Sequence, residues 1–203
     1  MLFFTFFLGF STSYLGTIAP SMLNITATKI RIEKNKKTAV NFSKGVAFIV
    51  LFQSFFALFF LKVMHNNPYI LEIIQSVSSV VFAIISFFFF RIALQEQKET
   101  THKKTISNGF LTGIGLSLVN MFSIPFYCGI GATFSMYGWL SLDTTSIVFF
   151  VIGSSLGTYY ILYHYVLLAN KIKSKIATFS KYINFLLGSI TGIVSLFSFH
   201  YLL

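Results

Sequence analysis

The chain has 203 residues, of which 55% are hydrophobic and only 10% are charged, and its mean hydropathy is +0.78. This composition excludes a soluble globular domain and indicates a polytopic membrane protein. A formal net charge of +10 raises the alternative of nucleic-acid binding, but the Lys and Arg residues fall between apolar stretches and no aromatic–basic recognition motif accompanies them. Nucleic acid is therefore not an expected partner.

Six apolar stretches are long enough to cross a membrane. The hydrocarbon core is about 30 Å thick and a helix rises about 1.5 Å per residue, so each crossing needs about 20 apolar residues. The stretches lie at about 2–28, 41–63, 69–93, 108–138, 144–169 and 180–203. The sequence therefore predicts an all-α integral membrane protein with six transmembrane helices.

The basic residues predict the topology of these spans. Of the 15 Lys and Arg, six surround the first gap, four the third and four the fifth, whereas the second gap has only Lys62 and the fourth has Asp143 instead. The positive-inside rule places the first, third and fifth gaps in the cytoplasm, so both termini are expected outside. The first stretch has no basic n-region or small-residue cleavage signature and is interpreted as a span rather than a signal peptide. We expect a multi-pass protein of the cytoplasmic (inner) membrane, in contact with membrane lipids.

A hydrophilic segment divides the spans into two sets of three. An odd number of crossings per set makes the two sets oppositely oriented, which is the inverted 3+3 plan of many secondary transporters. The predicted organisation is an N-terminal half at 1–94, a cytoplasmic linker at 95–107 and a C-terminal half at 108–203. Gly9-Phe10-Ser11-Thr12 is similar to Gly109-Phe110-Leu111-Thr112, which supports a repeat.

The first and fourth spans each contain a proline at or beyond the midpoint, Pro20 and Pro125. A proline inside a helix removes one donor and frees the carbonyl four residues earlier, here those of Gly16 and Met121. Unmatched backbone at membrane depth survives only where protein or a watery cavity covers it, and paired breaks mark the substrate site of a transporter. We therefore predict broken first and fourth helices that line a binding site.

Three amide side chains fall at membrane depth: Asn24 follows Pro20, Gln53 is in the middle of the second span, and Asn120 precedes Pro125. Each could instead hydrogen-bond a neighbouring helix, a contact worth on the order of 1 kcal/mol. That structural role is favoured for Gln53, whereas a site role is favoured for the two asparagines. The predicted substrate-binding residues are Gly16, Pro20, Asn24, Gln53, Asn120, Met121 and Pro125.

Few other side chains are candidates for a functional role. Glu72 is expected to meet water or Lys62 near the outer interface, and His164 to be a neutral, hydrogen-bonded residue rather than a proton relay. The single Cys128 is interpreted as a small apolar filler. Glycines four residues apart predict close helix packing, either within the chain, which is favoured, or in a homodimer. These glycine pairs are 109 and 113, 153 and 157, and 188 and 192.

Catalytic and metal-binding patterns are missing from the sequence. It contains no Gly-rich phosphate loop with lysine, no His-Glu-x-x-His and no intramembrane acid pair. It also lacks the clustered carboxylates that hard cations prefer and the His or Cys cluster that softer metals prefer. We therefore expect no enzymatic activity, no cofactor and no metal site.

At these residues the chain resembles the LysE/RhtB family of amino-acid exporters, which are small six-span translocators. The first-span residues Gly9-Phe10-Ser11 and Gly16-Thr17-Ile18-Ala19-Pro20-Ser21-Met22-Leu23-Asn24 look like the family's glycine and proline segment. A basic turn and a second span opening near Gly45 follow, as in the family. In the second half, Gly109-Phe110-Leu111-Thr112-Gly113 through Leu118-Val119-Asn120 looks like the family's Gly-to-Asn-Pro stretch, except that the proline comes only at Pro125.

The leading hypothesis is a secondary transporter that exports an amino acid or similar small zwitterion by alternating access between two halves. The helix that restarts after Pro20 would offer N–H groups to a carboxylate, and the freed carbonyls would accept from an ammonium group. One alternative is a cation or metal transporter. A second alternative is a membrane scaffold or assembly subunit that does not transport.

Overall fold

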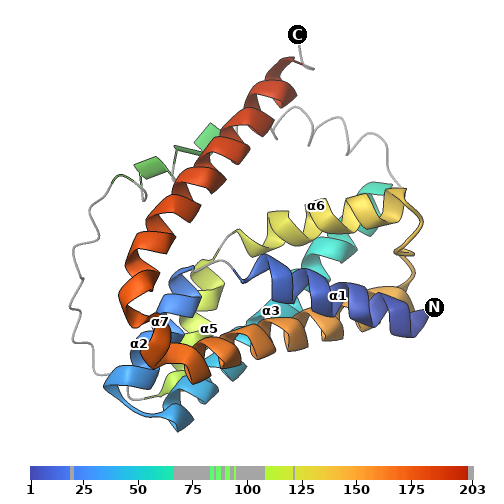
Figure 1. Cartoon of the computed structure of the whole chain (residues 1–203). Coiled ribbons are helices and arrows are strands. Elements are labelled where there is room, and N and C mark those ends of the chain that lie inside the picture. Colours follow the sequence, from blue (N-terminus) through green and yellow to red (C-terminus); the bar gives the residue numbers. More distant parts are fainter. Residues whose placement is uncertain are drawn as a thin grey trace. The chain divides into compact units, whose positions relative to one another are not determined.

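The computed structural model describes residues 1–18, 21–65, 83–84, 86–87, 90–91, 94, 108–120 and 122–200, with only the backbone for most of α7 beyond Ile172. In this part of the chain the regular structure is entirely helical, which confirms the predicted all-α class (Figure 1). The helices are α1 (Leu2–Gly16), α2 (Met22–Glu33), α3 (Lys36–His65), α5 (Gly109–Val119), α6 (Ser123–Met136) and α7 (Thr144–His200).

Both apolar stretches that contain a mid-span proline are interrupted. The first stops at Gly16 and restarts at Met22, and the second stops at Val119 and restarts at Ser123 with a bend of 66°. The predicted sites Pro20 and Met121 fall in these two interruptions, outside the described residues. Each apolar stretch therefore consists of two shorter helices.

The structure places Pro125 at a different position in its helix from the predicted one. It is the third residue of α6 rather than an interior residue, so the break lies ahead of it, at residues 120–122. The first N–H groups of a helix have no partner inside the helix, so a proline in the first turn costs no hydrogen bond. Pro125 therefore helps α6 to begin and does not interrupt it.

The helix α7 also differs from the prediction. A polar gap was expected between spans at 144–169 and 180–203, but the backbone is helical throughout Thr144–His200. The lysine-rich segment 170–179 contains neither Gly nor Pro, and lysine is a good helix former, so nothing local ends the helix there. Lysines likewise open α3, five residues before the predicted start. Charge marks where a span leaves the membrane but does not stop a helix.

Two described helices, Lys36–His65 and Thr144–Ile172, are long and apolar enough to cross a membrane, and the bent pair α5 and α6 is a third candidate. Helix α1 is apolar but shorter, at 15 residues. Most of the predicted span at 69–93 lies outside the described residues. The six-helix arrangement and the two halves therefore stay predictions.

The chain forms two compact units, one of Met1–Val63 with Lys104–Lys173 and the other of Met64–Lys103 with Ser174–Leu203. The first unit holds α1, α2, α3, α5, α6 and the first part of α7, and its core includes the fully buried side chains of Phe42, Leu58, Phe150 and Leu162. In the second unit Ser86 Oγ donates to the Gly188 carbonyl at 2.8 Å, and Gly192 faces the same serine.

Two helix pairs of the first unit pack backbone to backbone. A Cβ added to their contact glycines would overlap a carbonyl oxygen of the facing helix, so only glycine permits this approach. The glycines are Gly9, Gly153 and Gly157 between α1 and α7, and Gly45, Gly109 and Gly113 between α3 and α5. The predicted packing within the chain is confirmed for the pairs at 109 and 113 and at 153 and 157.

Candidate functional site

The two helix breaks of the first unit adjoin each other. Gly16, the last residue of α1, lies against the ring of Phe126 in the first turns of α6, and a Cβ at Gly16 would collide with that ring. One turn earlier in α1, Ser13 Oγ is 2.7 Å from the hydroxyl of Tyr127. Figure 1 shows α1 beside α6, with the first part of α7 along α1. The end of one broken stretch therefore meets the restart of the other.

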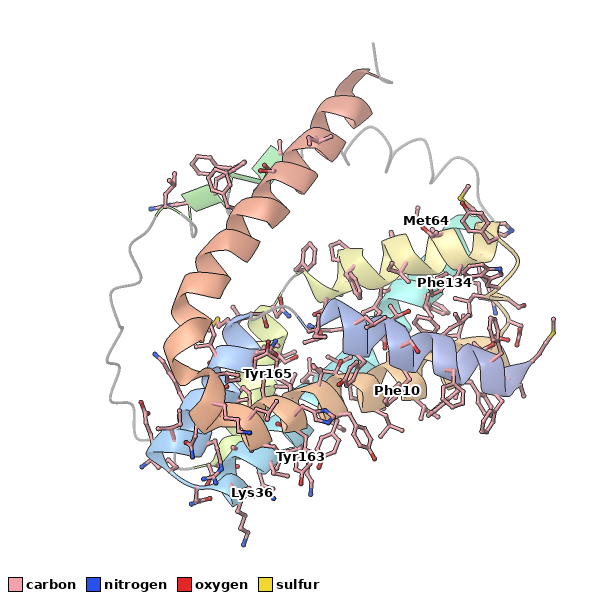
Figure 2. The ribbon with its side chains drawn as sticks, in the orientation of Figure 1. Phe10, Lys36, Met64, Phe134, Tyr163 and Tyr165 are labelled. Carbon is pink, nitrogen blue, oxygen red and sulfur yellow. The ribbon has the colours of Figure 1, made fainter. Side chains whose placement is uncertain are left out.

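Side chains satisfy the carbonyls at the first break. Asn24, a fully buried residue of α2, donates from Nδ2 to the Thr17 carbonyl at 2.7 Å. Tyr165, which projects from the first part of α7, donates its hydroxyl to the Ile18 carbonyl at 2.7 Å (Figure 2). Because an unmatched carbonyl in hydrocarbon costs several kcal/mol, these two bonds supply the partners that a helix break at membrane depth would need.

Gln53 donates to backbone carbonyls at the second break. Its side chain on α3 is 7% exposed, and Nε2 donates to the carbonyls of Ser117 at 2.9 Å and Asn120 at 3.4 Å. Asn120, the C-cap of α5, donates from Nδ2 to Ser123 Oγ at 3.1 Å and so bridges the break. The end of α5 is thereby tied to α3.

Two buried polar atoms at the second break have no hydrogen-bond partner among the described residues: Gln53 Oε1 and Ser117 Oγ. Both residues are buried, with Ser117 fully inaccessible. Buried polar atoms nearly always have a partner, so an exception calls for an explanation. An acceptor and a hydroxyl are thus available to a ligand beside the break.

Three of the four labelled helix starts away from the breaks are capped by side chains, and the start of α1 is not. Asn35 Oδ1 accepts from the Thr38 amide at the start of α3, and Asn108 Oδ1 accepts from two amides at the start of α5. At α7 the cap is Asp143, whose Oδ1 accepts from the Ser146 amide at 3.0 Å. The Ser146 amide and hydroxyl lower the pKa of Asp143, so the capping carboxyl stays ionised.

The two helix starts at the breaks differ from these three. Neither α2, with N-cap Ser21, nor α6, with N-cap Phe122, has a side-chain cap, and neither has an acidic residue in its first turn. A helix N-terminus presents N–H groups and the positive end of the helix dipole, which together suit a carboxylate. The start of α6 presents fewer free N–H groups, because Pro125 has no N–H.

The predicted site residues divide into three groups. Gly16, Asn24, Gln53 and Asn120 lie at the breaks, Pro125 lies in the first turn of α6, and Pro20 and Met121 are outside the described residues. Whether any of them contacts a substrate stays a prediction. The bonds of Asn24 and Gln53 to backbone carbonyls show that both also have a structural role.

Sequence reasoning overlooked several hydroxyl residues at this site. Ser13, Ser117, Tyr127, Thr158 and Tyr165 all lie near the breaks, and all but Tyr165 are buried. Tyrosine and serine are common in apolar spans, so nothing in their pattern separates them from packing residues. The sequence offers one general signal for such residues: a hydroxyl group at membrane depth needs a hydrogen-bond partner.

The other residues singled out by the sequence take structural roles. His164 is exposed, and its Nδ1 lies 2.9 Å from the Tyr160 carbonyl, so it is hydrogen-bonded as predicted. Cys128 is half-buried between α6 and α3, with Sγ 3.3 Å from the Ala57 carbonyl. Glu72 lies outside the described residues. Among those that are described, no three His, Cys, Asp or Glu side chains come together.

Comparison with known proteins adds one match. The sequence model of a family described as LysE type translocator matches residues 14–201, a range that includes both helix breaks. No curated protein and no solved structure matches the chain significantly. Because the family match covers nearly the whole chain and agrees with its apolar helices, this chain belongs to the LysE type translocator family, whose members are membrane transporters that typically export amino acids.

Proposed function

We propose that this protein is a secondary transporter that exports an amino acid or a similar small zwitterion across the cytoplasmic membrane by alternating access. Its termini and the Asp143 segment face outside, and its lysine-rich segments face the cytoplasm. Family membership supports transport, and the 14 basic residues in alternate gaps support this orientation.

The observation that carries the proposal is the contrast between helix starts. The starts of α3, α5 and α7, away from the breaks, have side-chain caps, whereas α2 and α6 restart at the breaks without one. Helix α1, which follows the N-terminal residue, also has no side-chain cap. The substrate carboxylate binds at the start of α2, where the helix dipole and amides favour it. Helix α2 packs against α5, whose end is held by Gln53, and Gln53 Oε1 accepts from the substrate ammonium group.

The chemistry of the described side chains at the breaks also suits a zwitterion. They are amides and hydroxyls, which orient polar groups without adding net charge. A dedicated cation site would instead be built from carboxylates, or from His and Cys for softer metals. The amino acid is therefore favoured over the metal or cation alternative.

Everted membrane vesicles test this function directly. Vesicles with and without the protein are given each labelled amino acid in turn, in the presence and absence of a pH gradient. We expect protein-dependent accumulation of at least one amino acid, and its loss when an uncoupler removes the gradient. Accumulation of a labelled divalent cation instead would favour the cation-transporter alternative, and no accumulation of either kind would favour a scaffold.

A further inference from the structure

Helix α6 is held in the first unit differently from its neighbours. The pairs α1 with α7 and α3 with α5 pack through glycines at backbone distance, so each pair moves as one body. In α6, a Cβ at Gly131 would meet only the side chains of Leu58 and Leu61, and one at Gly129 would meet nothing within 4 Å. At these two glycines α6 therefore has no backbone-to-backbone contact of the kind that holds the other two pairs.

One of those contacts is polar and buried. Tyr127 is 3% exposed, and its hydroxyl is 2.7 Å from Oγ of Ser13, which is fully buried on α1. Thr158 of α7 is 2% exposed, and its side chain lies beside the same hydroxyl. We refer to Ser13, Tyr127 and Thr158 as the hydroxyl cluster. The α1–α7 pair supplies two of its members and α6 supplies one.

The chain next to α6 is suited to act as a hinge. Gln53 ties the carbonyls of Ser117 and Asn120 to α3, so α5 stays with α3 up to the break. Between the C-cap Asn120 and the N-cap Phe122 the direction of the chain changes by 66°, and hinges are found at such ends of rigid elements. Beyond the break, the hydroxyl cluster is the buried polar link between α6 and the α1–α7 pair.

We propose that Tyr127 is a positioning residue that latches α6 against the α1–α7 pair, and that release of this latch opens the site at the breaks to one side of the membrane. The inference rests on the proposed transport function. Separating the hydroxyls leaves polar groups that need new partners, so release requires water to enter between α6 and α1. In the proposed topology α6 leads to the outer segment at 137–143, so water enters from outside.

The test uses Cys128 as a reporter, because it is the only cysteine and follows Tyr127 directly. Its Sγ contacts the Ala57 carbonyl of α3, a contact that is lost when α6 moves away. Labelling of Cys128 by a membrane-impermeant maleimide is timed in right-side-out and in everted vesicles. The variant Tyr127→Phe keeps the ring and removes the hydroxyl, and Tyr137→Phe makes the same change at an exposed position beyond α6.

We expect Tyr127→Phe to speed labelling about fivefold in right-side-out vesicles only, the ratio that corresponds to about 1 kcal/mol for one hydrogen bond. Acceleration in everted vesicles only would contradict opening to the outside. Tyr137→Phe should label at the wild-type rate. Equal acceleration from both sides, which indicates general loosening, or no acceleration from either side overturns the latch. If Tyr127→Phe fails to fold, Ser13→Ala serves as the second variant with the same outcomes. Labelling needs no substrate, so a protein that transports no amino acid could still show the latch.

Discussion

The amide side chains at the helix breaks differ in how much they contribute to the stability of the fold. Asn24 and Gln53 are buried and donate to carbonyls that the breaks leave free. Asn120 is half-buried, and its side chain donates to Ser123 across the break. Removing Asn120 should therefore affect a ligand more than the fold, whereas removing Asn24 should affect both.

For Asn120→Ala we expect transport to fall about fivefold or more, since a hydrogen bond to the ligand is worth about 1 kcal/mol. The melting temperature in detergent should stay close to that of the wild type. Asn108→Ala is the matched control at the opposite end of α5, where the side chain caps the helix. Its transport should be nearly normal. Normal transport by Asn120→Ala would remove this residue from the substrate site.

For Asn24→Ala we expect a loss of stability as well as of transport. The substitution leaves the partly buried Thr17 carbonyl without its donor, which costs about 1–3 kcal/mol. Thr26→Ala on the same helix removes an exposed bond to the Met22 carbonyl and should cost much less. Thermal unfolding in detergent compares the two variants. Equal stability would mean that another group takes over the Thr17 carbonyl.

At the scale of the helices, close packing is specified by single glycines. Gly157 faces the Phe10 carbonyl and the Ser13 side chain, so any Cβ there forces α7 away from α1. Gly115 on α5 has nothing within 4 Å of an added Cβ. The same residue type is therefore essential at one position and replaceable at the other.

Gly157→Leu should accordingly impair folding or lower the melting temperature strongly, because the side chain separates two backbones in contact. Gly115→Leu is the control and should be neutral or slightly stabilising, since leucine favours a helix more than glycine does. Fluorescence-detected size exclusion and thermal unfolding measure both effects. Wild-type stability of Gly157→Leu would contradict the packing of α1 on α7.

At the scale of the whole molecule, the charge distribution predicts which segments lie on each side of the membrane. In a Cys128→Ser background, single cysteines at Lys34, Lys103 and Lys173 should react with an impermeant reagent only in everted vesicles. A cysteine at Asp143 should react in intact cells. Reaction of position 103 in intact cells would overturn the orientation and, with it, the direction of transport proposed here.

Local properties of the sequence determined the class of the protein and the place of its breaks. Hydropathy depends on composition alone, so it indicated a membrane protein without any contact being known. The helix stop at Gly16 lies close to Pro20, because proline acts on its immediate neighbours. The second break lies in the stretch that contains Pro125, although Pro125 itself belongs to the first turn of α6. The four-residue glycine spacing indicated close packing, because it places both glycines on one face of a helix.

Only the tertiary structure decided which groups meet. The donors to the Ile18 and Ser117 carbonyls come from helices distant in the sequence, and no local pattern identifies them. The sequence did not predict the position of Pro125 in α6 or the continuous helix through 170–179. The ends of helices inside a protein depend on packing as well as on composition. The contact of Ser13 with Tyr127 exists only because the glycines of α1 and α7 bring those helices together beside α6, which is a property of the packed unit and not of either segment.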